Sequence, residues 1–162
     1  MFVSRRDFLL LTCTIGIYAG LSAGLQAFGE DTKVPVSVNL KKVAIGGYDS
    51  VAYFTDGRPI QGKSDFETEW LGARWWFANE AHRDMFAKQP ETYAPRFGGF
   101  CAGAMVLGTT VKADPEVWAI IDGKLYLNAD KEGLADFQSS SASNIQSAEE
   151  HWRSLADKGR PQ

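Results

Sequence analysis

The chain has 162 residues and a formal net charge of −3 at neutral pH, a length that leaves room for one domain. The charged residues form no basic stripe, which argues against nucleic acid as a partner. Hydrophobic residues make up 44% of the chain, and five of its residues are tryptophan. A core can therefore form without disulfides or a structural metal.

Residues 1–27 have the order of a secretory leader: Arg5 and Arg6, then an apolar stretch from Phe8 to Leu25, then a small residue, Ala27, for cleavage. Ser4 before the arginines and Phe8 after them favour a twin-arginine signal, which exports folded proteins. We therefore predict a periplasmic or otherwise exported protein without membrane attachment after cleavage. An uncleaved anchor is the alternative, because the apolar stretch is near the ~18 residues that span a bilayer.

Removal of this leader would change both the charge and the cysteine content. The leader holds two arginines and one aspartate, a net +1, so subtracting it from −3 leaves −4. Cys13 lies inside the leader, which leaves Cys101 as the single cysteine of the mature chain. A lone thiol in an oxidising compartment is buried, bound to a metal or reactive.

The first half of the mature chain indicates short strands and one helix. An extended connector is expected at 28–45, and a short strand that ends at the turn Asp56-Gly57 is expected to follow it. Alternating residues over 66–77 predict a hairpin that turns at Gly72. Asn79 is a suitable N-cap for a helix over 80–88, and Pro90 ends that helix.

The second half begins with the apolar run 97–108, in which alanines and Met105 favour a short helix between glycines. A hairpin over 116–130 is centred on Asp122-Gly123, a pair suited to positive φ. A polar linker at 139–143 and an amphipathic helix over about 143–157 complete the chain. No internal repeat is apparent. The expected fold is α+β, a small antiparallel sheet of hairpins with short helices packed on it.

Several stretches together resemble the exported bacterial branch of the YHS-domain family. They are "GYDSVAYF", the hairpin around "WLGARWWFA", "RFGGFCA" and "DPEVWAIIDGKLYLN". The resemblance covers roughly 46–130 and implies a YHS-like domain over 46–138, with a linker and helix at 139–162. It implies an α+β module related to metal-trafficking domains and more often non-catalytic than an enzyme.

The resemblance also implies a metal site, which this sequence alters. In cysteine-bearing relatives the soft-metal ligands stand at positions that are Ala52, Ala78 and His82 here, so only Cys101 and His82 remain as candidates. Met105 lies four residues after Cys101, which places both sulfurs on one face of a helix. Cysteine, histidine and methionine together suit copper better than zinc. We therefore predict Cys101, His82 and Met105 as ligands of copper or another soft metal.

Other interpretations remain open. Cys101 could be a buried, inert residue of a structural or interaction domain that meets a protein partner through an aromatic surface, because Trp75 and Trp76 face opposite sides of a strand. A thiol-based redox protein is the third interpretation, although Cys101 has no resolving cysteine. His82 alone is more often a surface or supporting residue than a ligand, and Asp49 is expected to cap a turn.

Overall fold

The structure is a computed structural model that describes residues 35–158. The predicted leader at 1–27 lies outside the described residues, as does the first part of the predicted connector. Within the described range, no helix is both long and apolar enough to cross a membrane.

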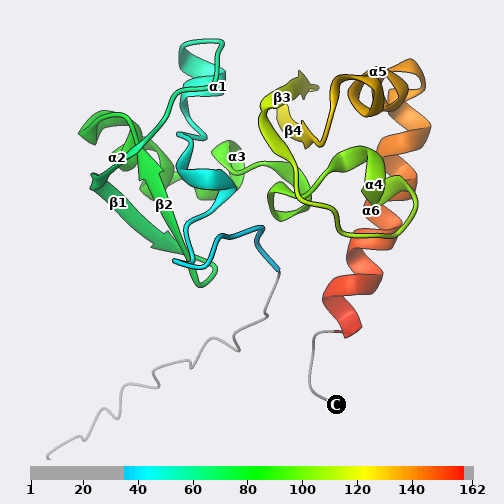
Figure 1. Cartoon of the computed structure of the whole chain (residues 1–162), viewed down its shortest axis with the longest axis horizontal. Coiled ribbons are helices and arrows are strands. Elements are labelled where there is room, and N and C mark those ends of the chain that lie inside the picture. The colour runs from blue at the N-terminus through cyan, green and yellow to red at the C-terminus, as the bar shows by residue number, and fades with distance from the viewer. Residues whose placement is uncertain (1–34, 159–162) are drawn as a thin grey trace, which may run out of the picture.

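The described chain forms two units side by side (Figure 1). The first contains the 3-10 turn η1 (Ile45–Gly47), α1 (Ala52–Thr55), β1 (Lys63–Trp70), β2 (Ala73–Phe77), α2 (Glu80–Lys88) and α3 (Pro90–Tyr93). The second contains η2 (Arg96–Gly99), α4 (Ala102–Val106), β3 (Asp114–Ile121), β4 (Lys124–Asn128), α5 (Lys131–Ser139) and α6 (Ser141–Lys158). The predicted α+β class is confirmed, with two separate two-stranded antiparallel sheets, β1-β2 and β3-β4, among the described residues.

The two hairpins have the same register and the same irregularity. Each is shifted once near its open end, and the shifts lie between Lys63 and Glu67 and between Asp114 and Trp118. Each turn has two residues of positive φ, Leu71-Gly72 and Asp122-Gly123. Such turns match the right-handed twist of paired strands, which is why they close two-residue hairpins.

The helix after each hairpin also repeats. Asn79 caps α2 by accepting a hydrogen bond from the backbone N–H three residues on, and Asp130 caps α5 in the same way. Each helix then buries a phenylalanine seven residues after its cap, Phe86 in α2 and Phe137 in α5. Each side-chain oxygen thus satisfies an amide that the first turn leaves unpaired.

A glycine-rich turn begins both units. Gly46 and Gly47 have φ of 67° and 85°, and Gly98 and Gly99 have φ of 61° and 80°. Both turns are closed by the same bond, in which the N–H of the next residue donates to the carbonyl three residues earlier. A side chain at Gly98 would meet the carbonyl oxygen of Pro35, so glycine is required there for close approach as well as for φ.

These correspondences define an internal repeat, and the expectation of none is wrong. Residues 63–89 correspond to 114–140 with a constant offset of 51, which is 114 minus 63. We call residues 45–89 the first repeat and 97–140 the second repeat. Identical residues in the aligned stretch are only Gly72/Gly123, Ala78/Ala129 and Phe86/Phe137. The repeat was missed because hairpin register and capping geometry persist while the side chains differ.

Two further expectations are corrected. The segment predicted as a short strand before Asp56-Gly57 contains the helix α1, which starts directly after a turn capped by Asp49. The linker predicted at 139–143 is reduced to one residue, because α5 ends at Ser139 and α6 begins at Ser141. Serine is favoured at helix ends as well as in loops, so a serine run alone does not separate these two cases.

The buried side chains form two clusters, of which the first joins the two repeats and the second lies in the second repeat and α6. The first contains Trp75, Phe77 and Phe86 and also includes Cys101. The second contains Phe97, Met105, Tyr126, Phe137 and Ala148, and the apolar face of α6 packs against it. The amphipathic face predicted for the last helix is confirmed, since Ile145, Ala148, Trp152 and Leu155 all belong to this cluster.

Candidate functional site

His82 lies in the first turn of α2 and is held by a buried carboxylate. Its Nδ1–H donates to Asp49 Oδ2 at 2.7 Å, and Asp49 is fully buried. Backbone amides supply the other bonds to Asp49: Val51 and Ala52 donate to Oδ1, and Ala78 donates to Oδ2. Asp49 thus caps a turn, as predicted, and in addition joins α1, the end of β2 and α2 at one point.

The second ring nitrogen of His82 faces the surface. Because the Asp49 carboxylate accepts the Nδ1 proton, Nε2 carries the lone pair of the neutral ring. Nε2 lies 3.4 Å from Thr55 Oγ1 and 3.8 Å from Asp56 Oδ2, and the side chain is 13% exposed. A carboxylate that orients one nitrogen of the imidazole ring is typical of metal-binding histidines. It is equally typical of a histidine that completes a polar network.

Cys101 stands at the N-cap of α4 and is 5% exposed. Its Sγ accepts a hydrogen bond from the Ala104 N–H at 3.4 Å and donates to Asn128 Oδ1 at 3.8 Å. Asn128 is fully buried, and its Oδ1 also accepts from the Gly103 N–H. In the second repeat Cys101 therefore occupies the position that Asp49 occupies in the first, 52 residues earlier (101 minus 49).

The three predicted ligands lie in different surroundings. Met105 is fully buried one turn after Cys101, but it belongs to the second cluster and Cys101 to the first. His82 is in α2, which lies in the opposite unit from α4 (Figure 1). Among the described residues, no three histidine, cysteine, aspartate or glutamate side chains are grouped as a metal ion would need. The metal assignment stays a prediction.

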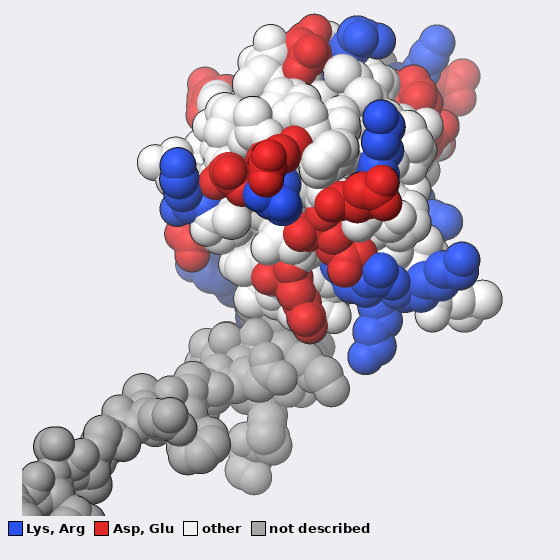
Figure 2. Space-filling model, turned by 90° about the vertical axis from the view of Figure 1, so that its left-hand side faces the viewer, with Lys and Arg blue, Asp and Glu red and all other residues white. Residues whose placement is uncertain are grey.

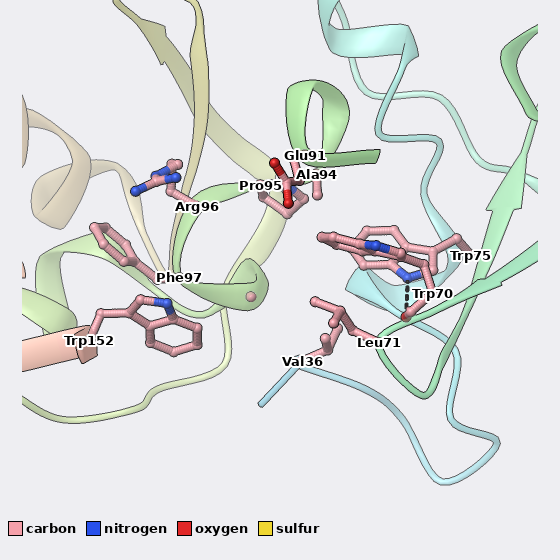
Figure 3. A pocket seen from close by; sticks show the side chains of 11 residues that line it. Val36, Trp70, Leu71, Trp75, Glu91, Ala94, Pro95, Arg96, Phe97 and Trp152 are labelled. Atoms are coloured by element: carbon pink, nitrogen blue, oxygen red, sulfur yellow. Dashed lines mark hydrogen bonds between the residues drawn. The ribbon is translucent and has the colours of Figure 1, made fainter. Parts of the chain in front are cut away.

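A groove lies between the two units, next to the β1-β2 turn (Figure 3). Its volume is about 500 Å³, within the range of ligand-binding clefts. Most of its lining residues are aromatic or aliphatic, namely Val36, Trp70, Leu71, Trp75, Ala94, Pro95, Phe97 and Trp152, but polar atoms contribute as much of its exposed surface as apolar atoms do. Figure 3 shows Trp70 and Trp75 on one side of the groove, opposite Phe97 and Trp152.

Local contacts hold the two tryptophans of the first repeat in place. The Trp75 indole N–H donates to the Trp70 carbonyl at 3.1 Å, and the two rings lie 5.8 Å apart. Phe86 stacks on Trp75 at 4.9 Å, so α2 supports this side of the groove from behind. Leu71 at the hairpin turn is 40% exposed and lies at the lip. The accessible part of this wall is therefore the partly buried Trp70 and the exposed Leu71, with the buried Trp75 behind them.

Two ionisable side chains border the groove. Arg96 donates to Glu149 of α6 at 2.9 Å, and its Nε–H is buried without a hydrogen-bond partner. Glu91 in α3 is exposed and forms no ion pair with another described residue. Figure 2 shows that the outer face of the first repeat carries mixed acidic and basic side chains and no continuous basic stripe. The groove has fewer charged side chains along its lining than this outer face has on its surface.

The sequence did not predict the groove, although it placed Trp75 and Trp76 on opposite faces of a strand. Trp75 and Trp76 do face opposite ways: Trp75 lies in the core beside the groove, and Trp76 is half-buried and donates to Glu67. The contribution of Trp152 from α6 was missed, because its helical spacing indicates only a buried face. The bond between Asp49 and His82 was also missed, since they are 33 positions apart and no local pattern links them.

Comparison with known proteins identifies no relative: no family model, no curated protein and no solved structure matches the chain. The resemblance to exported YHS-domain proteins therefore remains a prediction from the sequence motifs.

Proposed function

We propose that the chain is a non-catalytic binding module that holds a protein partner in the groove between its two units. The observation that carries this proposal is that the partly exposed Trp70 and Trp152 line the groove, with the exposed Leu71 at its lip. Tryptophan is enriched among the residues that dominate binding energy at protein interfaces.

The environment of Cys101 supports the non-catalytic part of this proposal. The thiol is buried, accepts one backbone hydrogen bond and donates to a buried asparagine. Buried thiols of this kind are inert packing residues in most proteins. The predicted leader would place the module in the periplasm or outside the cell, where its partner would also lie.

The proposal is tested by photo-crosslinking in the native host. A photoreactive amino acid replaces Leu71 at the groove lip in one version and Ile120, which is 37% exposed on the second hairpin, in a matched control. We expect a discrete adduct from position 71 and none from position 120. The adduct should weaken in a chain that also carries Glu91→Lys, because this exposed change alters the groove border without affecting the core. The same adducts from both positions, or none from position 71, would contradict the proposal.

Metal binding at His82 is a second proposal, favoured by one observation. The buried Asp49 fixes Nδ1, so Nε2 is left 3.8 Å from the Asp56 carboxylate. Imidazole suits copper and zinc, and the carboxylate suits zinc as well. Copper remains the metal that the sequence favours, with Cys101 and Met105 as the predicted sulfur ligands.

A copper titration of the mature chain tests this second proposal, with His82→Ala, Asp56→Asn and Cys101→Ser versions measured beside it. Binding that is lost in His82→Ala and weakened in Asp56→Asn would place the metal at the surface of α2. Binding that is lost in Cys101→Ser would favour the sulfur ligands. Absence of binding in the unmodified chain would exclude the metal proposal.

A further inference from the structure

A second pocket lies in the second repeat, between α4, α5 and the start of α6, and its volume is about 370 Å³. Its lining residues are Gly103, Val106, Leu107, Gly133, Asp136, Phe137, Ser139, Ser140 and Asn144. Phe137 is buried, whereas Leu107 is 80% exposed and Val106 and Asn144 are half-buried. The accessible surface of this pocket therefore comes from α4, from the C-terminal end of α5 and from Asn144 in α6.

The internal repeat shows what the first repeat holds at the equivalent place. The capping residues of α1 and α4 are 52 positions apart, and each accepts a hydrogen bond from the N–H three residues on. The offset of 51 that relates α2 to α5 also relates the starts of α3 and α6. The pocket residues Val106, Leu107, Gly133 and Asn144 therefore correspond to Phe54, Thr55, His82 and Tyr93.

In the first repeat these counterparts contact one another in two pairs. The rings of Phe54 and Tyr93 pack edge to face with their centroids 5.5 Å apart, and Thr55 Oγ1 lies 3.4 Å from His82 Nε2. In the second repeat a glycine and an asparagine stand where the imidazole and the phenol ring would be. A Cβ at Gly133 would meet nothing within 4 Å except the carboxylate that caps α5. The pocket is therefore the space that two missing rings leave open.

The second repeat also lacks a positive charge at this place. The last turn of α2 contains Lys88, whereas its counterpart Ser139 leaves the last turn of α5 without a basic residue. Asp136 is the one charged residue that lines the pocket, and it forms no ion pair with another described residue. A carboxylate near the C-terminal end of a helix is unfavourable, and a cation there is favourable. The pocket thus lacks both the rings and the cation of the first repeat.

We propose that this pocket binds a small aromatic amine, an aryl ring joined to an ammonium group by a short alkyl chain. The ring would lie against Val106 and Leu107, in the place that two rings occupy in the first repeat. The ammonium group would approach Asp136 and supply the positive charge that Lys88 gives to α2. This site goes beyond the proposed binding groove, because the two share no lining residue.

Tyramine is the probe, and 4-ethylphenol, which has the same ring without the ammonium group, is its neutral control. The full chain with ¹³C-labelled leucine and valine methyl groups is titrated with each compound and observed by NMR. We expect tyramine to shift the methyl signals of Leu107 and Val106 and to leave those of Leu71 at the groove in place. The dissociation constant should be about 1 mM, since the probe has only about ten non-hydrogen atoms. 4-Ethylphenol should bind about threefold more weakly, because the exposed ion pair is screened by solvent.

Two substitutions of Gly133 separate filling of the pocket from loss of the fold. Gly133→His restores the ring of the first repeat and should weaken tyramine binding at least about tenfold. Gly133→Ala is the matched control and should change it less than about twofold, because a methyl group leaves the pocket open. Both variants should remain folded in urea unfolding experiments, since replacing a helical glycine reduces the entropy of the unfolded chain. Asp136→Asn should bring tyramine to the affinity of 4-ethylphenol.

Three results would overturn the inference: no shift of Leu107 at 10-fold the expected dissociation constant (about 10 mM), undiminished binding by a folded Gly133→His variant, or equal affinity for tyramine and 4-ethylphenol. Each of these is independent of the crosslinking result at position 71, because that position borders the groove and not this pocket. Failure of the amine site would therefore leave the proposed partner groove untouched, and failure of the groove would leave the amine site untouched.

Discussion

Asp49 shows how one buried side chain organises the first repeat. Its two carboxylate oxygens accept three backbone hydrogen bonds and one from His82. A buried carboxylate is stable only when its acceptor capacity is filled in this way. The sequence indicates a capping role for Asp49, because aspartate is common in turns. Its link to α2 depends on a long-range contact that no local pattern encodes.

Asp49→Asn should destabilise the protein by about 3 kcal/mol, because the new amide N–H₂ would face donors in place of an acceptor. Urea unfolding of the mature chain measures this change. Asp65→Asn, at an exposed position of β1, is the control and should stay within about 0.5 kcal/mol of the unmodified chain. Equal stability of the two variants would show that the Asp49 network contributes little.

Glu67 gives the fold a modest dependence on pH. A hydrogen bond from the Arg74 guanidinium lowers the pKa of the Glu67 carboxyl, and the Trp76 indole N–H lowers this pKa as well. A carboxyl whose pKa is depressed by folding stabilises the native state above its unfolded pKa of about 4.3. This stabilisation is lost as the pH falls through the lower folded value.

The difference in urea midpoint between the unmodified chain and Glu67→Gln should therefore shrink as the pH is lowered from 6 toward 3. The effect is small, because the pair is partly exposed and screened by solvent. A second variant, Arg74→Gln, should reproduce most of the change. A midpoint difference that stays constant over this range would show that the ion pair does not contribute through the charge of Glu67.

At the scale of elements, local sequence signals predict a helix or hairpin correctly wherever capping and turn chemistry fix its structure. Both hairpins and the helix after Asn79 are predictable from Asp-Gly or Leu-Gly turns and from the cap. Three helices were missed for identifiable reasons, and α3 is a single turn that begins at Pro90. α1 is a single turn held by Asp49, and α5 has a weak apolar pattern in which Phe137 is its one fully buried side chain. Such elements form because tertiary contacts complete them.

The paired caps test whether the two repeats are equivalent in energy as well as in geometry. Asn79→Ala and Asp130→Ala should each destabilise the protein by about 1 kcal/mol, because each leaves a first-turn amide without its side-chain acceptor. Thermal or urea unfolding of the two variants measures both values under one set of conditions. A change near zero in one variant and a large change in the other would show that the repeats are equivalent in shape only.

At the scale of the whole molecule, the internal repeat explains the fold. Two similar hairpin-helix units bury the equivalent residues Trp75 and Tyr126 to the same extent, and the cluster around Tyr126 includes residues of α6. The individual elements are visible in the sequence, but their pairing into repeats is not, because the side chains have diverged. The groove also could not be predicted, since Trp70 and Trp152 meet across it from segments far apart in the chain.

The crosslinking comparison between positions 71 and 120 tests the central claim most directly, because both are exposed aliphatic residues and only one borders the groove. The account predicts a discrete protein adduct from position 71 that weakens with Glu91→Lys, and no adduct from position 120. Equal adducts from the two positions, or none from position 71, would contradict the claim that the groove is the functional surface.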